Sequence, residues 1–165
     1  MRYVVHNYFP KRAIDSYREF PEAWAQAKSI DPLRYLRGLT KLTFIADVDQ
    51  WNAAYIPEDD EIEIQNKFHK KTFNDKIQTL LHEGGHRGQM RVDKKTFEAM
   101  KSAGLINVPN FLAMANQVHQ DDYHKNGIGS RELGDEVYAE SYARFALGMG
   151  LPEGLKKFWS ERVSR

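Results

Sequence analysis

The sequence predicts an α+β fold, in which a small N-terminal mixed sheet precedes a series of helices. Residues 39–48 are rich in β-forming side chains and give the best strand pattern. Residues 61–65 alternate strictly between apolar and polar side chains, which also indicates a strand. After residue 65 the apolar residues recur at helical spacing instead. A chain of 165 residues is expected to form one domain, residues 1–165.

The first 65 residues are expected to build the sheet, with one helix between its strands. In the last strand Ile62 and Ile64 alternate with Glu61, Glu63 and Gln65, which predicts a half-exposed strand at a sheet edge. The expected elements are a β-leaning start at 2–9, a helix at 15–30, a strand at 39–48 and an edge hairpin with arms at 51–56 and 61–65.

The remaining chain is expected to be helical, with glycines and prolines marking the ends of its helices. The predicted helices are an active-site helix at 73–90 and C-terminal helices at 94–103, 108–119, 132–147 and 152–162.

Composition and charge exclude several classes of protein. Lys and Arg number 24 and Asp and Glu 23, and this balance argues against a nucleic-acid partner. The chain has no cysteine, so disulfides and cysteine ligands are excluded. No stretch reaches the roughly 20 apolar residues of a membrane span, and no secretory signal is visible at the N-terminus. We expect a soluble protein with no membrane partner, and a cytoplasmic location is favoured.

Residues 82–86 read His-Glu-Gly-Gly-His within the predicted active-site helix. Side chains four residues apart lie on the same face of a helix, so His82 and His86 can bind one metal ion together. Zn²⁺ is the ion typical of this spacing, and Glu83 between the histidines is then the general base that acts on the attacking water. The motif therefore predicts a zinc cofactor.

The helical position of the motif favours metal binding over a place in the core. Phe73, Ile77 and Leu81 define the apolar face of the helix, and the two histidines fall on the opposite side. An ordinary solvated face is the alternative. The two glycines of the motif argue against it, because each costs about 1 kcal/mol relative to Ala in mid-helix. They indicate that another backbone approaches closely here.

A catalytic zinc ion needs a third protein ligand. An extended motif with a third His at position 92 is absent, since this residue is Val, so the ligand is an Asp, a Glu or a distant His. Glu136 and Glu140 share one stripe of a predicted helix with apolar residues, where unpaired carboxylates would be costly. They either serve the metal site, or Glu140 pairs with Arg144 while Glu136 is solvated.

Together these residues resemble the zincin metallopeptidases of the gluzincin type, in which a His-Glu-x-x-His helix precedes a helix that supplies a Glu ligand. The string Glu-Val-Tyr-Ala-Glu-Ser-Tyr at 136–142 is similar to the ligand helix of lethal factor-type peptidases. The resemblance covers the chain from the hairpin to this helix. It implies a minimal zincin-like domain in which Glu136 is the third zinc ligand and Glu140 steadies a ligating His.

The resemblance also implies a function, the hydrolysis of peptide bonds in a peptide or protein substrate. Zinc on His82, His86 and Glu136 would activate the water, and Glu83 would take its proton and pass it to the leaving amine. The strand at 61–65 is expected to bind the extended substrate by β-addition.

The side chain that stabilises the developing oxyanion is not assigned by the resemblance. Lethal factor-type peptidases have a Tyr shortly before the ligand Glu, where this chain has residues 127–130, Gly-Ile-Gly-Ser. Tyr123 and His124 lie just before this stretch, and both can donate a hydrogen bond. We favour His124, since Asp121 and Asp122 would keep it protonated. The alternative is that both are loop surface residues.

Two other functions are compatible with the sequence. A zinc-stabilised, non-catalytic interaction domain would fill the fourth ligand position with His119 or His124. Nucleic-acid binding would use the basic runs at 67–71 and 94–95, but short runs of this kind are usually solvated faces. A zinc metallopeptidase is the function that the sequence favours.

Overall fold

The computed structural model describes residues 2–5, 11–45, 52–107 and 130–164 of the chain, and these residues have the predicted α+β architecture. Strands come first and helices dominate the second half. The elements are β1 (Arg2–Val5), α1 (Lys11–Ile30), β2 (Lys41–Ile45), β3 (Ala53–Ile56), β4 (Glu61–Gln65), α2 (Asn66–His69), α3 (Phe73–Arg87), a π-helix (Gly88–Val92), α4 (Lys94–Ser102), a 3₁₀ turn (Leu105–Asn107), α7 (Ser130–Ala146) and α8 (Glu153–Val163).

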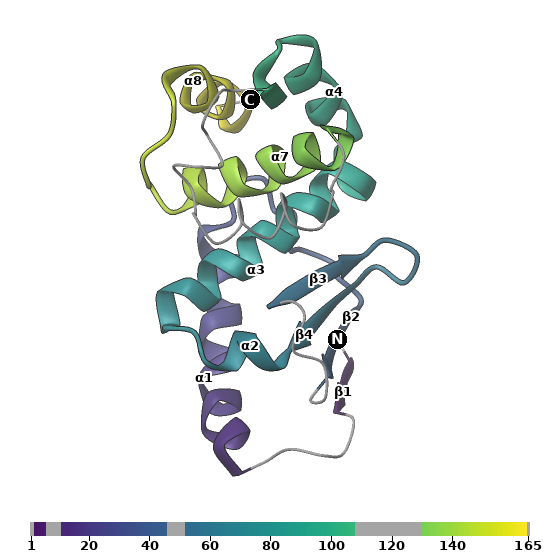
Figure 1. Cartoon of the computed structure of the whole chain (residues 1–165), viewed down its shortest axis with the longest axis vertical. Helices are drawn as coiled ribbons and strands as arrows, with labels where there is room; N and C mark the ends of the chain where they lie inside the picture. The colour runs from purple at the N-terminus through teal and green to yellow at the C-terminus, as the bar shows by residue number, and fades with distance from the viewer. Residues whose placement is uncertain (1, 6–10, 46–51, 108–129, 165) are drawn as a thin grey trace.

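Helix α3 crosses the middle of the molecule and separates two layers. The strands lie with α1 and α2 on one side of α3, whereas α4, α7 and α8 gather on the other side (Figure 1). The four strands form one mixed sheet in the order β1-β2-β4-β3. β1 and β4 both run parallel to β2, and β3 runs antiparallel to β4. The prediction of a small mixed sheet with a hairpin at one side is confirmed.

The prediction that residues 61–65 form the edge strand is wrong. β4 bonds to β2 on one side and to β3 on the other, so β3 is the edge strand of the hairpin in the described part of the sheet. The alternating pattern was misleading because the polar face of β4 is covered as well. Glu61 is only 3% exposed and forms an ion pair of 2.7 Å with Lys41 of β2.

The long predicted helices are found wherever the structure describes their residues, whereas the short helix α2 was not predicted. α1 begins before the predicted start at residue 15, and α3 ends at Arg87 and continues as the π-helix. α3 begins after Thr72, whose Oγ1 accepts a hydrogen bond from the backbone N–H of Asp75. The helix predicted at 108–119 lies outside the described residues. No helix in the described ranges has the length and apolar character to cross a membrane.

Two hydrophobic clusters hold the layers together. The first lies between the sheet, α1 and α3, and reaches α7 through Ala143: it comprises Phe20, Ala23, Trp24, Ala27, Leu36, Leu39, Leu42, Phe44, Tyr55, Ile62, Ile64, Phe68, Ile77, Leu80, Leu81 and Ala143. The second lies between α7, α4, α8 and the segment after α1: it comprises Tyr35, Met100, Val137, Tyr138, Tyr142, Leu155 and Trp159. Helix α7 therefore packs against both clusters, and this fixes the face that it turns toward α3.

Candidate metal centre

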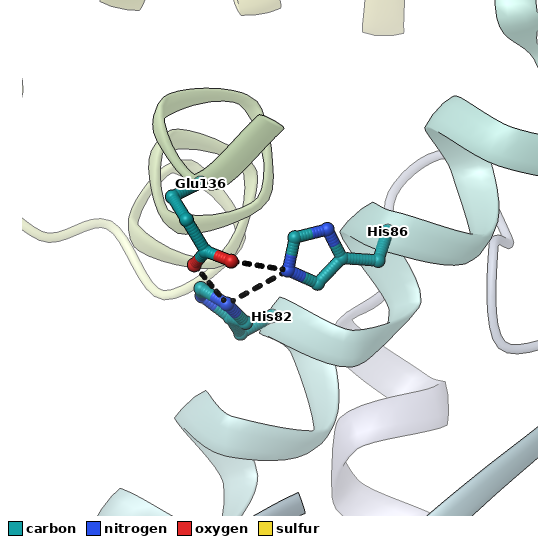
Figure 2. Close-up of side chains that lie close together, drawn as sticks. All are labelled: His82, His86 and Glu136. Carbon is teal, nitrogen blue, oxygen red and sulfur yellow. Dashed lines mark hydrogen bonds and ion pairs between the residues drawn. The ribbon is translucent and has the colours of Figure 1, made fainter. Parts of the chain in front are cut away.

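His82, His86 and Glu136 converge between α3 and α7, and their ligand atoms all lie within 4.8 Å of one another. The Nε2 atoms of the two imidazoles are 3.2 Å apart. The Glu136 carboxylate spans both rings, with Oε2 at 3.1 Å from His82 Nε2 and Oε1 at 3.3 Å from His86 Nε2 (Figure 2). The three side chains are close enough to bind one metal ion.

Local sequence and helix packing together produce this arrangement. The two histidines are one turn apart on α3, and Glu136 faces them from α7 because the two helices approach very closely at Gly85. A Cβ atom at Gly85 would stand 2.7 Å from the Cα of Ala139. A Cβ at Gly84 would meet only the side chain of Leu36, at 2.9 Å. The close backbone approach expected from the two glycines is found at Gly85.

Glu140 lies one turn after Glu136 and is 3% exposed. Its Oε2 faces Nδ1 of His82 at 3.2 Å, on the ring nitrogen that points away from Glu136. Its Oε1 accepts hydrogen bonds from Arg144 Nε and Gln78 Nε2, both at 3.0 Å. The two roles considered for Glu140 are thus compatible, since it pairs with Arg144 and orients His82 at the same time.

The buried charges of the centre depend on one another. Burial alone would lower the pKa of His82, but hydrogen bonds to Glu136 and Glu140 outweigh it and raise the pKa well above its ordinary value. The pKa of His86 is also raised, because the charge of Glu136 and a hydrogen bond to it outweigh burial. Burial would raise the pKa of Glu136, yet the two imidazoles hold it well below its ordinary value. Protons on the rings therefore compensate the carboxylates, and a metal cation can take their place.

Glu83 is 5% exposed and projects from α3 toward the edge strand β3. Its Oε2 accepts a hydrogen bond of 2.8 Å from the backbone N–H of Tyr55. Oε1 has no hydrogen bond to a described residue. Burial raises the pKa of the Glu83 carboxyl, although the charges of His82 and His86 oppose this. A buried carboxylate with a raised pKa and one free oxygen is suited to general-base chemistry.

The structure brings together the four residues predicted around the metal and the predicted base. Tyr123 and His124, predicted to stabilise the oxyanion, and His119, an alternative ligand, lie outside the described residues. Sequence reasoning missed Gln78, which lies one turn before His82 on the side of α3 that faces Glu140. It also missed the contact of Tyr55 with Glu83, for which the sequence holds no local signal.

Comparisons of the chain with protein-family models, with curated proteins and with solved structures found no match. A function is therefore inferred from the residues and the geometry of the centre itself.

Proposed function

We propose that this chain is a zinc-dependent metallopeptidase. The observation that carries the proposal is the convergence of two imidazole Nε2 atoms and one carboxylate, with contacts of 3.1–3.3 Å. Tetrahedral zinc with bonds of about 2.0–2.1 Å sets its ligand atoms about 3.3 Å apart. Two protonated rings facing each other would repel, whereas one divalent ion replaces both protons and compensates Glu136.

The number of ligands favours a catalytic site over a structural one. In the part of the chain that the structure describes, no fourth His, Asp or Glu joins the group of His82, His86 and Glu136. Structural zinc sites have four protein ligands, whereas catalytic sites have three and an open position. The alternative, a zinc-stabilised interaction domain, requires His119 or His124 as a fourth ligand.

The chain's own residues supply the remaining parts of the mechanism. When bound, zinc would polarise a water molecule and the scissile carbonyl. Glu83 lies beside His82 in the sequence and has Oε1 free to take the proton of the attacking water and deliver it to the leaving amine. Glu140 holds the His82 ring in place through Nδ1.

The substrate would bind at β3, the edge strand, and not at β4 as the sequence suggested. In the hairpin the backbone N–H of Gln65 donates to the carbonyl oxygen of Asn52, so these two residues form a hydrogen-bonded pair. Hydrogen-bonded and non-hydrogen-bonded pairs alternate along an antiparallel ladder, and Tyr55 is therefore in a non-hydrogen-bonded pair with Ile62. The N–H of Tyr55 accordingly points away from β4, toward Glu83. An extended peptide added along this edge would lie beside the base and the metal ligands.

The experiment compares the wild type with Glu83→Gln on a peptide library, with zinc content measured in parallel. We expect the variant to keep its zinc and its fold and to lose about 10²–10⁴-fold in kcat, as for the loss of a general base. Glu153→Gln, an exposed change in α8, is the matched control and should behave like the wild type. Near-normal turnover by Glu83→Gln would exclude the proposed mechanism.

A further inference from the structure

The edge strand, the hairpin turn and α3 are joined in a closed ring of hydrogen bonds. Tyr55 N–H donates to Glu83 at 2.8 Å, and the hydroxyl of the same tyrosine donates to Asp60 Oδ1 at 2.9 Å. Arg87 completes the ring with two bonds to the Asp60 carboxylate, at 2.6 and 2.9 Å. Glu83 and Arg87 are one turn apart on α3, so the helix itself closes the ring.

Every member of the ring is buried. Tyr55, Asp60 and Arg87 are 7%, 4% and 5% exposed. The guanidinium of Arg87 also donates to the carbonyl oxygens of Tyr35 and Arg37. Burial and the bond to Asp60 raise the pKa of Tyr55 to about 12, so its hydroxyl keeps the proton that it donates. Burial would raise the pKa of Asp60, but Arg87 and Tyr55 hold it below its ordinary value and the carboxylate stays charged.

The ring acts on the two oxygens of Glu83 differently. Oε2 accepts from the backbone amide of Tyr55. The position of this residue is in turn fixed, because its hydroxyl bonds to Asp60 and Asp60 bonds to Arg87 on α3. Oε1 has no bond to a described residue and faces no such constraint. Without the ring, the carboxylate would rotate among its side-chain conformers, because terminal carboxylate torsions are broad.

We propose that Tyr55, Asp60 and Arg87 are positioning residues that hold Glu83 so that Oε1 alone accepts the proton of the attacking water. This inference rests on the proposed peptidase function.

The test uses Tyr55→Phe, which removes the hydroxyl and leaves the pair of Asp60 and Arg87 intact. We expect kcat to fall about 10-fold, the rate equivalent of one hydrogen bond, with KM changed by less than about 2-fold and zinc retained. Tyr142→Phe is the matched control, since it also removes a buried bond from a tyrosine to a carboxylate, that of Asp31, and this tyrosine has no hydrogen bond to a member of the ring. Its kcat should equal that of the wild type.

Two further measurements separate positioning from a general loss of stability. In the Glu83→Gln background, Tyr55→Phe should cause no further loss of rate, because the ring acts through Glu83. A further 10-fold loss there, or an equal effect of Tyr142→Phe in the wild type, would overturn the inference. Hydrogen exchange of the amide at position 55 should accelerate in Tyr55→Phe and not in Tyr142→Phe. This measurement does not require enzymatic activity. Unchanged exchange would refute the proposal that the ring holds the amide of Tyr55 in place. Accelerated exchange in a protein that cleaves no peptide would refute only the peptidase function.

Discussion

Replacing Gly85 by Ala is expected to separate the two proposed metal ligands of α3 from the proposed ligand of α7. The added Cβ would lie 2.7 Å from Ala139 Cα and 3.2 Å from its Cβ and carbonyl oxygen. Carbon atoms in ordinary contact are about 3.5–4.0 Å apart, so α7 must retreat by about 1 Å. The neighbour is backbone and cannot rotate away.

The effect on the metal should exceed the effect on the fold. Overpacking costs about 1–3 kcal/mol, but Ala is about 1 kcal/mol better than Gly within a helix, which leaves a net loss of about 0–2 kcal/mol. Glu136 is three residues from Ala139 on the same helix and should move with it. Metal–ligand distances tolerate deviations of only about 0.2 Å. Loss of a contact that supports a ligand costs about 10–100-fold in affinity, and displacement of a ligand should cost more, so zinc affinity should fall about 100-fold or more.

Zinc affinity is measured by competition with a chelator, and the free energy of unfolding by denaturant titration. The matched control is Gly84→Ala, whose Cβ would meet only side-chain atoms of Leu36, the nearest at 2.9 Å, and no backbone. Gly84→Ala should bind zinc like the wild type. Wild-type zinc affinity in Gly85→Ala would refute the reasoning that the close approach of α7 builds the site.

Other perturbations test the remaining parts of the site. Glu136→Ala should lose most of its zinc at neutral pH, whereas Glu140→Ala should weaken zinc affinity by about 10–100-fold; the reverse order, measured by chelator competition, would exchange their roles. The pKa values of His82 and His86 are raised in the fold above their ordinary value of about 6.5. Protonation of the two rings therefore stabilises the metal-free fold fully below about pH 6.5, and this stabilisation is lost as the pH rises through the raised pKa values. Zinc should therefore raise Tm more at about pH 8 than at about pH 6. His124→Ala should lower kcat far more than it raises KM, with zinc retained, and an unchanged kcat would remove this residue from the mechanism.

The parts of the site that could be predicted are those governed by local geometry. Spacing along one helix places His82 beside His86, and the same rule places Glu136 beside Glu140. The glycines of the motif predicted a close backbone approach, because a mid-helix glycine has a cost that packing must offset. The order of strands and helices followed from the change of apolar period after residue 65.

The parts that could not be predicted depend on contacts between distant segments. Alternation in Glu61–Gln65 shows which side chains share a face, but it does not say whether a second strand bonds to the other edge. The bonds from Tyr55 to Glu83 and from Arg87 to Asp60 span 28 and 27 residues and have no periodic signature. An Arg one turn after the base was the one available hint, since a buried guanidinium in such a helix requires a carboxylate partner.

We propose that the chain holds a catalytic zinc ion with an open coordination position. A crystal structure of the zinc-loaded protein, with the metal located by its anomalous signal, tests this most directly. We predict one zinc ion bound by Nε2 of His82, Nε2 of His86 and the Glu136 carboxylate at about 2.0–2.2 Å, with solvent as the fourth ligand. A fourth protein ligand, or a zinc ion bound elsewhere, would contradict the claim.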